Sequence, residues 1–350
     1  MVGLVLLTLS PGEIGGSETY VRGLARALAV RGHMPVTAYV SRAAADAGEG
    51  LPTDVVDEYP IARSRRGRLA VRALVAARSG SARRRIGVLD AVHYPLTVAV
   101  PRLDARAAVT LHDTLHRDLP ELFGRAERLY RAIAYDRSAR RARLVIVPSA
   151  FVRDRAVALL GIPGERIRVI HHGLDHDRFR PSSDEREPFL LYPARPWRHK
   201  NHARLFEAFA LLRRTRPALR LVLTGGEFRA LPDGVESRGR VSADELATLY
   251  RRAAALVFPS LYEGFGQPPL EALACGCPVV AARAGSLIEV CGDAARFFDP
   301  HSPADIAAAA AEVLDAPDEW RRRGLERAAA FTWDACAAAH EDVYRELLAS

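Results

Sequence analysis

Two glutamates, Glu263 and Glu271, stand eight residues apart around a glycine turn. The residues between them are Gly264, Phe265, Gly266, Gln267, Pro268, Pro269 and Leu270. Prolines suit the first turn of a helix, whose amides lack intrahelical partners, and a helix N-terminus favours anions. Carboxylates accept hydrogen bonds from hydroxyl groups. The segment therefore predicts a site for a ligand that carries both phosphate and sugar hydroxyls, with Gln267 at the phosphate end.

A second group of polar residues, Arg195 to Asn201, directly follows a predicted strand. Ligands of open α/β sheets bind outside the carboxyl ends of the strands. The planar guanidinium of Arg195 can bind two phosphate oxygens, and Lys200 can act as a compact charge on the same diphosphate. Lys200 is also the only lysine among 50 basic residues, which suggests that this position requires a lysine. Two solvated surface cations are the alternative interpretation.

Glycines and a histidine follow two strands of the first half. Gly15 and Gly16 come after the first predicted strand and permit a tight turn, which alone is a weak signal because the dinucleotide spacing G-x-G-x-x-G is absent. His112 and Asp113 end a later strand, where we expect a polar side chain to face a cleft between two domains. A lone histidine is more often structural, so a functional role for His112 is predicted only together with the other motifs.

Strand-like and helix-like stretches alternate along the whole chain, which predicts an α/β fold made of two Rossmann-like, doubly wound domains. A polar segment with prolines, 175–188, interrupts the alternation and predicts the linker. We therefore expect domains at 1–174 and 175–332, and a final amphipathic helix at 333–350 that crosses back to the first domain. The predicted strands are 3–9, 35–40, 91–94, 107–111, 144–147, 168–170, 189–192, 219–224, 255–258 and 278–281.

Composition narrows the class of protein. No apolar run reaches 18 residues and the N-terminus lacks the basic flank of a signal peptide, so we expect a cytoplasmic protein. The cysteines show no paired spacing and have no neighbouring histidine pair, which predicts reduced, structural thiols. They are Cys275, Cys277, Cys291 and Cys336.

Positive charge is concentrated in the first half. Residues 1–175 hold 27 basic and 17 acidic side chains, whereas the whole chain has a net charge of +8. The arginine-rich stretch Arg63 to Arg85 is either a solvated helix face or a contact with an anionic surface, such as the inner membrane face or an acidic acceptor. Nucleic-acid binding is not predicted, because no aromatic residues are interleaved with these arginines.

Taken together, these motifs resemble the glycosyltransferase group 1 family, which comprises retaining enzymes of the GT-B type. The resemblance covers nearly the whole chain, and the Glu263 to Glu271 string is its most specific part. The chain departs from the family at Ala194, where a glycine is common. The other matching segments are 15–18, 31–33, 110–113, 148–151, 172–175 with Phe179, and Arg195 with Lys200 and Asn201.

The resemblance implies a metal-independent, cofactor-free transfer of a sugar from a nucleotide diphosphate-sugar, with UDP or GDP as the carrier. The first domain would bind a glycan, lipid-linked or natural-product acceptor, and the second the donor. The implied catalytic residues are His112, Arg195, Lys200 and Glu263. The other implied contacts are Gly15, Gly16, Arg195, Lys200 and Gln267 with the diphosphate, His112 and 263–266 with the sugar, Glu271 with the ribose, and Arg240 and Val241 with the base.

Three other interpretations are weighed against this one. Asp175-His176-Asp177 has the D-x-D pattern of a metal site, but it lies in the predicted linker. A non-hydrolysing nucleotide-sugar epimerase could share the architecture, but it needs acid and base residues in place of the Glu263 to Glu271 string. A non-catalytic binding protein of the same fold would have no need of both phosphate cations and His112. The sequence leaves the donor base, the sugar and the acceptor undetermined.

The single lysine allows a direct test. Apart from the α-amino group of Met1, Lys200 is the only amine in the chain, so an amine-specific reagent has one internal target. We expect bound nucleotide diphosphate to reduce labelling of Lys200 while labelling of Met1 stays unchanged, because the ammonium contacts the diphosphate. Peptide mass mapping with parallel activity assays measures both effects. Equal labelling of Lys200 with and without nucleotide, in an enzyme that keeps full activity, would show a solvated surface cation.

Overall fold

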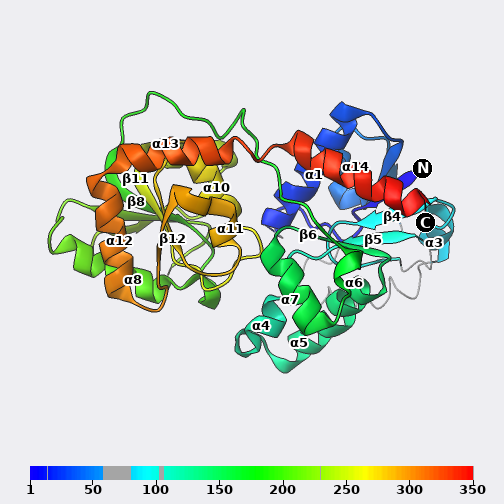
Figure 1. Ribbon diagram of the computed structural model, residues 1–350, viewed down its shortest axis with the longest axis horizontal. Helices are drawn as coiled ribbons and strands as arrows, with labels where there is room; N and C mark the ends of the chain where they lie inside the picture. The colour runs from blue at the N-terminus through cyan, green and yellow to red at the C-terminus, as the bar shows by residue number, and fades with distance from the viewer. Residues whose placement is uncertain (14, 58–79, 102–105, 229, 350) are drawn as a thin grey trace. The chain divides into compact units, whose positions relative to one another are not determined.

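The structure is a computed structural model that describes residues 1–13, 15–57, 80–101, 106–228 and 230–349. The chain forms two compact units, Met1–Gly173 with Trp333–Ser350 and Leu174–Thr332 (Figure 1). Most of the arginine-rich stretch that begins at Arg63 lies outside the described residues. Only its end, in helix α3 (Gly80–Ile86), is described. No helix within the described ranges is long and apolar enough to cross a bilayer.

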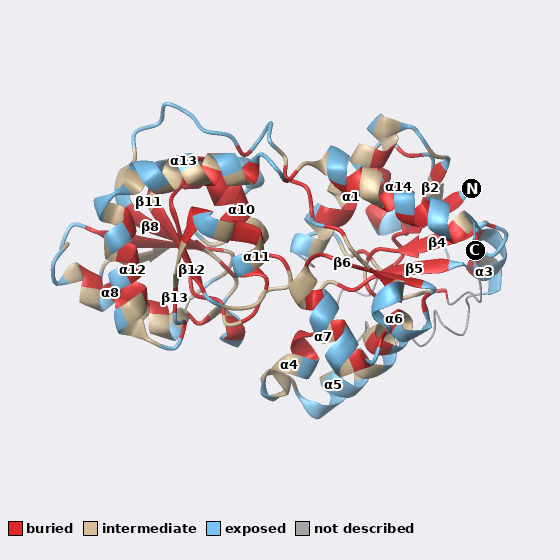
Figure 2. Ribbon diagram, in the orientation of Figure 1, coloured by how far each residue is buried: buried red, intermediate tan, exposed pale blue. Residues whose placement is uncertain are grey.

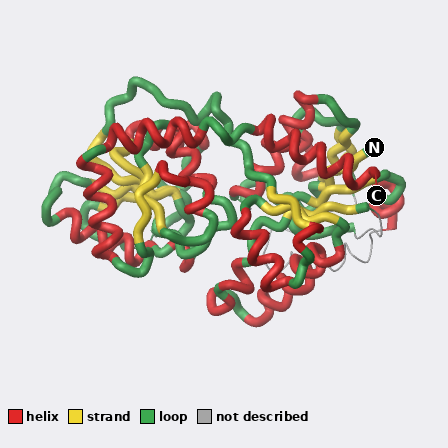
Figure 3. The backbone as a smooth tube through the Cα atoms, viewed as in Figure 1, coloured by secondary structure: helices red, strands yellow, loops and turns green. Residues whose placement is uncertain are grey.

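The first unit contains a sheet with helices around it (Figure 3). Each neighbouring pair of its described strands is parallel. Its order is β3 (Thr53–Val55), β2 (Val36–Val40), β1 (Val2–Val5), β4 (Ala91–Tyr94), β5 (Ala107–Thr110), β6 (Leu144–Val147) and β7 (Ile167–Val169). The chain order reverses between β1 and β4, as in a doubly wound sheet.

Helices cover both faces of this sheet. Alternate strand residues point to opposite faces, so Leu4 packs in one core with α1 and α14, while its neighbour Val5 packs in a second core with α3, α6 and α7. The helices of this unit are α1 (Gly16–Arg31), η1 (Arg42–Gly48), α3, α4 (Leu115–Asp118), η2 (Pro120–Leu122), α5 (Arg125–Arg131), the π-helix η3 (Ala132–Asp136), α6 (Arg137–Arg141), α7 (Ala150–Leu160), η4 (Gly164–Arg166) and α14 (Trp333–Ala349).

The second unit repeats the design with a parallel sheet around a single core. Its strand order is β10 (Val235–Ser237), β9 (Arg220–Thr224), β8 (Glu187–Pro193), β11 (Ala253–Phe258), β12 (Val279–Ala282) and β13 (Ala295–Phe298). Its helices are η5 (Arg198–Lys200), α8 (His202–Arg213), α9 (Ala243–Arg252), α10 (Gln267–Ala274), α11 (Leu287–Cys291), η6 (Gly292–Ala294), α12 (Pro303–Asp315) and α13 (Pro317–Ala328).

The predicted fold class, α/β with two doubly wound parallel sheets, is confirmed. In both units the central strands are buried and the helices expose one side (Figure 2). The four cysteines are reduced and buried, as expected. Sequence reasoning missed β3, β10 and β13, which lie at sheet edges. Each is only three or four residues long and partly exposed, so none carries the continuous apolar run of a central strand.

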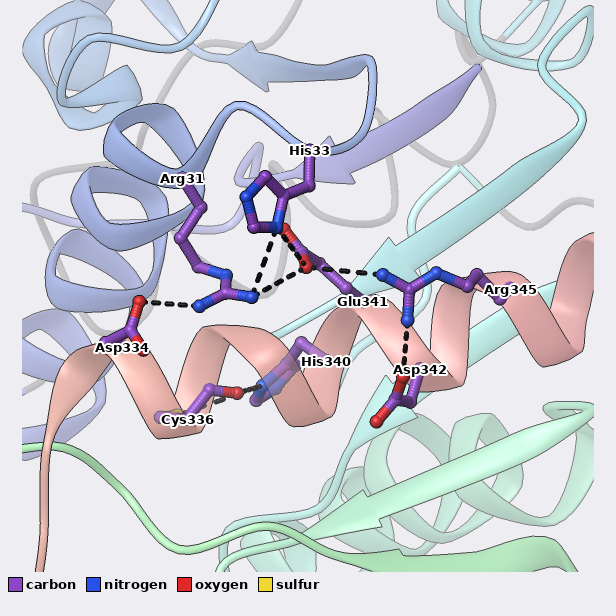
Figure 4. Close-up of polar contacts among 8 residues, drawn as sticks. All are labelled: Arg31, His33, Asp334, Cys336, His340, Glu341, Asp342 and Arg345. Atoms are coloured by element: carbon purple, nitrogen blue, oxygen red, sulfur yellow. Dashed lines mark hydrogen bonds and ion pairs between the residues drawn. The ribbon is translucent and has the colours of Figure 1, made fainter.

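The final helix, α14, belongs to the first unit and packs along α1. Arg31, in the last turn of α1, donates to Asp334 at 2.5 Å and to Glu341 at 3.2 Å (Figure 4). Glu341 is 1% exposed, so Arg31 supplies the charge that compensates its burial. These ion pairs hold the first three turns of α14 against the C-terminal end of α1.

Two glycines make room for the first residue of α14. A Cβ atom on Gly23 would lie 2.3 Å from the Trp333 ring, and one on Gly173 would lie 2.5 Å from the Trp333 backbone. Such distances are far inside van der Waals contact. The close approach of α1 and the 173 segment to Trp333 therefore requires glycine at both positions.

The fold predicts that Gly23→Ala destabilises the protein, although alanine in a helix interior normally stabilises by about 0.5–1 kcal/mol. Overpacking against Trp333 should outweigh that gain, since such insertions cost about 1–3 kcal/mol. Thermal unfolding of Gly164→Ala is the control, because a Cβ there meets nothing within 4 Å. A midpoint for Gly23→Ala equal to or above that of the control would show that α14 does not press on α1 in this way.

Candidate active site

The second unit has its topological switch point between β8 and β11. From β8 the chain continues to β9 and β10 on one side, and from β11 it continues to β12 and β13 on the other. The loops after β8 and β11 therefore diverge at the carboxyl edge of the sheet and leave a crevice where ligands of such folds bind. Lys200 follows β8 and Glu263 follows β11, so both predicted residues belong to this place.

Lys200 and Glu263 form an ion pair. The Lys200 ammonium donates to Oε1 of Glu263, and each side chain is 14% exposed. The ammonium also lies 5.8 Å from the centre of the Phe258 ring, at the end of β11. The carboxylate partner holds the lysine side chain in one place, which suits a residue that later contacts an anionic ligand.

The loop that carries Lys200 is held by three neighbouring segments. The Tyr192 hydroxyl donates to the Lys200 carbonyl at 2.6 Å, and Leu261 N–H donates to the His199 carbonyl at 2.8 Å. The Asn201 side-chain amide donates to the carbonyls of Pro259 (3.1 Å) and Pro300 (2.7 Å). These bonds fix the β8 loop against the loops after β11 and β13 before any ligand binds.

A glycine and a serine, which sequence reasoning missed, fix the Glu263 backbone. Gly285 has φ +58°, and a Cβ there would lie 2.6 Å from the Glu263 carbonyl oxygen. The Ser286 hydroxyl lies 3.1 Å from that oxygen and 2.7 Å from the Phe265 carbonyl oxygen. The signal in the sequence was a Gly-Ser pair shortly after an apolar strand, which alone indicates only a turn.

The sequence predicts several backbone amides without intrahelical partners at the start of α10, and the structure differs from this expectation in detail. Gly266, the N-cap, has φ +102°, which favours glycine. Pro268 and Pro269 have no N–H, so the first turn of α10 has fewer amide donors than expected. Phe265 is 5% exposed, and the centre of its ring lies 6.0 Å from the centre of the Phe331 ring. Its side chain belongs to the core, which leaves only its backbone to face a ligand.

Glu271 lies one turn into α10 and is 7% exposed. The Tyr250 hydroxyl, on α9, donates to its Oε2 at 3.0 Å. Burial raises the pKa of Glu271 to about 8, and the Tyr250 hydrogen bond and Arg178 only partly offset that effect. The carboxyl group is therefore mostly protonated at neutral pH until a ligand favours its ionised form.

The remaining predicted residues of this unit lie after neighbouring strands. Arg195 is half-buried just beyond β8, with its guanidinium 5.3 Å from the Trp197 ring. Arg240 is exposed and Val241 is half-buried, between β10 and α9. In the D-x-D pattern, Asp175 accepts a hydrogen bond from Arg178 at 2.8 Å.

His112 lies in the first unit, two residues beyond β5, and is half-buried. Its Nε2 lies 2.8 Å from the Pro95 carbonyl oxygen, which can only accept, so Nε2 carries the proton. Burial lowers the pKa of His112, and the neutral ring presents Nδ1 as an acceptor. The following loop is anchored by Asp136, which bonds His116 at 2.9 Å and Arg117 at 2.7 Å.

Gly15 and Gly16 form the start of α1, beyond β1. Gly15 is the N-cap with φ 60°, and no side chain caps this helix. Glu18 Oε2 accepts from the Gly12 N–H at 2.7 Å, which closes the preceding turn. Both glycines are exposed at the carboxyl edge of their sheet.

The structure thus gathers Arg195, Lys200, Glu263 and the start of α10 at the switch point of the second unit. Glu271 lies further along α10, and Arg240 with Val241 lie beyond the edge strand β10. His112 and Gly15 with Gly16 lie at the corresponding edge of the first sheet. The contributions of Gly285, Ser286 and Tyr250 were not foreseen, because each acts through a partner distant in the sequence.

The raised pKa of Glu271 predicts that nucleotide diphosphate binds more tightly as pH rises from 6 to 9. Ribose hydroxyls donate to the carboxylate, so binding below pH 8 must release a proton, and affinity should change by at most about tenfold per pH unit. Calorimetry at several pH values measures this dependence.

Glu271→Gln is the matched control for this titration. The glutamine keeps a hydrogen-bonding side chain without a proton to lose, so the phosphate's own titration, with a pKa of about 6, should be all that remains. Identical pH profiles for the two proteins would exclude Glu271 as the titrating contact.

Comparison with known proteins agrees with these motifs. The model of the family "Glycosyl transferases group 1" matches residues 175–330, and that of "Glycosyltransferase Family 4" matches residues 14–178. O-antigen chain mannosyltransferase B of Escherichia coli is 30% identical over 290 residues, covering 74% of this chain and 75% of that protein. MMP alpha-(1->4)-mannosyltransferase of Mycolicibacterium hassiacum is 32% identical over 59% of this chain and 54% of its own length.

Solved structures share the fold over nearly the full chain. Sucrose-phosphate synthase from Thermosynechococcus elongatus has a TM-score of 0.79 at 23% identity, with 99% of both chains covered. HepE from Anabaena, solved with UDP and glucose, has a TM-score of 0.74 at 19% identity, with 99% and 100% covered. At these identities the likeness concerns the fold alone. The matches and the two doubly wound units show that this chain is a GT-B protein and belongs to the group 1 glycosyltransferases.

Proposed function

We propose that this glycosyltransferase moves a hexose from UDP- or GDP-sugar to a hydroxyl of a glycan, lipid-linked or natural-product acceptor, with retention of the anomeric configuration. The Lys200–Glu263 pair at the switch point carries the proposal. It sets a cation for the diphosphate beside a carboxylate for sugar hydroxyls, next to a helix N-terminus that favours anions.

Each part of the donor is assigned to the residues whose chemistry suits it. Arg195, Lys200, Gln267 and the Gly15–Gly16 turn bind the diphosphate, and Glu263 with the backbone of 264–266 binds the sugar. Glu271 accepts hydrogen bonds from the ribose hydroxyls, and Arg240 with Val241 borders the base. When the donor enters, its diphosphate replaces Glu263 as the partner of the Lys200 ammonium, which releases the Glu263 carboxylate for the sugar.

The reaction takes place on one face of the sugar. The acceptor hydroxyl attacks the anomeric carbon from the side on which the diphosphate leaves, the C–O bond to the diphosphate breaks, and the acceptor proton passes to the departing phosphate oxygen. Negative charge grows on the diphosphate, so Arg195, Lys200 and the amides at the start of α10 stabilise the transition state more than the ground state. No separate protein base is required.

His112 contributes as a neutral group. Because Nε2 donates to Pro95, Nδ1 accepts a hydrogen bond from a donor-sugar hydroxyl near the reacting carbon. A lowered pKa keeps the imidazole from adding a positive charge beside a carbon that becomes cationic. His112 therefore orients the sugar and tolerates the charge that develops on it.

Mannose is the first sugar to test, since two relatives are named mannosyltransferases. The rival functions are weaker: epimerisation would need an acid and a base at the sugar, and a binding protein would not need the cations that stabilise a leaving group. Contact of the basic first unit with the inner membrane face stays a prediction, as most of the arginine-rich stretch lies outside the described residues.

The reaction class is tested by incubating the protein with a panel of UDP- and GDP-hexoses and a mixed set of glycosyl acceptors. We expect one donor to be consumed with release of its nucleotide diphosphate, and a product whose anomeric proton coupling shows the configuration of the donor. Nuclear magnetic resonance of the product reads the configuration directly. An inverted product would overturn the front-face mechanism, and isomerised nucleotide-sugar without transfer would identify an epimerase.

Activity is expected to survive chelation, because Arg195, Lys200 and helix amides neutralise the diphosphate without a bound cation. Turnover measured before and after dialysis against EDTA should agree within about twofold. Lys200→Ala, assayed in parallel with and without added magnesium, should lose about 10²-fold or more in turnover in both conditions, on the scale of removing one preorganised donor. Loss of wild-type activity in EDTA, restored by magnesium or manganese, would contradict metal independence.

A further inference from the structure

We propose that Tyr20, on α1, is a positioning residue for His112: its ring sets the orientation of the imidazole, and its hydroxyl ties that ring to α14. The inference rests on the proposed function, in which His112 contacts the donor sugar. It concerns only residues of the first unit.

The ring of Tyr20 lies against His112. The two ring centres are 5.1 Å apart with an interplanar angle of 82°, an edge-to-face contact. His172 stacks on Tyr20, with centres 4.5 Å apart and 28° between the planes, and also meets His112 edge-on at 5.9 Å. Tyr20 is 1% exposed. The imidazole is therefore confined by two aromatic rings in addition to its bond to Pro95.

This confinement matters because a single hydrogen bond leaves the imidazole free to rotate. The outer torsion of a histidine side chain is intrinsically broad, so neighbours must select its orientation. The Pro95 carbonyl favours the proton on Nε2, and the Tyr20 ring limits rotation about the outer torsion of His112 that would carry Nε2 away from this carbonyl. Together they determine where Nδ1 points, and a displacement of about 1 Å in a positioning group can cost about 10²-fold in rate.

The hydroxyl of Tyr20 belongs to a buried chain of hydrogen bonds whose direction can be assigned. His340 Nδ1 lies 2.7 Å from the Cys336 carbonyl oxygen and must donate to it, so His340 Nε2 accepts from the Tyr20 hydroxyl at 2.8 Å (Figure 4 shows the His340–Cys336 bond). Tyr20 has then used its proton, and Thr110, at 3.1 Å, must donate to it.

The chain continues into the sheet. With its proton given to Tyr20, Thr110 accepts from His93 Nε2 at 2.8 Å, and His93 Nδ1 accepts from the Tyr344 hydroxyl at 2.9 Å. Both histidines are neutral in this scheme, which agrees with burial lowering the pKa of His340 to about 4 and that of His93 well below its usual value. Every proton in the chain has one donor and one acceptor.

This network links four elements to the site. Cys336, His340 and Tyr344 belong to α14, Tyr20 to α1, His93 to β4 and Thr110 to β5. Thr110 stands two residues before His112 in the same segment. The final helix, 320 residues away from Tyr20 in the sequence, therefore supports the ring that orients His112.

The test compares Tyr20→Leu, which removes the flat ring, with Tyr20→Phe, which keeps the ring and removes only the hydroxyl. Tyr94→Phe is the control, because Tyr94, on β4 of the same unit, is a buried tyrosine whose hydroxyl donates to the Pro101 carbonyl. We expect Tyr20→Leu to lower kcat by about 10- to 100-fold. Tyr20→Phe should keep kcat within about threefold of that of Tyr94→Phe. It should unfold at a lower temperature than the wild-type protein, because the buried His340 Nε2 loses its donor.

The nitrogen-15 chemical shifts of the imidazoles report which ring nitrogen carries the proton, and a change in stability alone does not alter them. His112 is assigned by its loss in His112→Ala, and we expect wild-type and Tyr20→Phe proteins to show the tautomer with the proton on Nε2. In Tyr20→Leu the signal should shift toward exchange between both tautomers. Should the leucine variant not fold, Tyr20→Met repeats the measurement with more of the volume filled.

Failure of the inference and failure of the proposed function give different results. Unchanged His112 signals and unchanged kcat in folded Tyr20→Leu or Tyr20→Met would overturn the positioning role, even if His112→Ala is inactive. If His112→Ala keeps full turnover, the proposed role of His112 is what fails, and the resonance comparison alone decides whether Tyr20 orders the ring.

Discussion

The contact between the Lys200 ammonium and the Glu263 carboxylate joins the ends of the two central strands of the second unit. Each partner is only 14% exposed, and removing either would leave the other charge partly buried without compensation. The surrounding features serve this contact: Asn201 fixes the loop of the lysine, while Gly285 and Ser286 fix the backbone of the glutamate. In the proposed mechanism, the incoming diphosphate takes over the lysine, so the pair keeps the site charged and ordered between turnovers.

The charge states of two other residues, Glu271 and His112, are determined mainly by burial and not by a charged partner. Glu271 is deep enough in α10 for its pKa to rise to about 8, and His112 is shielded enough for its pKa to fall. Both groups are therefore neutral without ligand near neutral pH, although one is an acid and the other a base. Burial disfavours the charged form of each, and the proposed ligand contacts restore the ionised form only for Glu271.

The first unit is completed by a helix from the other end of the chain. α14 buries apolar side chains beside α1, but it also brings His340, Tyr344 and Glu341 into the interior. Buried polar groups stabilise a fold only when their partners are present, and here α1 and β4 supply several of them. The helix is consequently part of the support of His112, which links the end of the chain to a residue in its first third.

Much of this protein was determined by local sequence. Alternating apolar periods were sufficient to predict two doubly wound sheets, because each period reflects the face that an element must bury. The residues that follow apolar strands were then readable as site candidates, since parallel strands place their carboxyl ends at one edge. For the same reason the Glu263 to Glu271 string and the lone Lys200 predict a site for phosphate and sugar from the sequence alone.

Tertiary structure decided which candidates meet and what state they are in. The Lys200–Glu263 pair joins residues 63 positions apart, and the Tyr20–His340 bond joins residues 320 positions apart. No period or spacing encodes such pairs. The edge strands β3 and β10 take their conformation from pairing with a neighbour, because three residues carry too little periodic signal. The neutrality of Glu271 and His112 likewise follows from burial, which depends on the packing of distant segments around each side chain and is therefore a property of the folded chain alone.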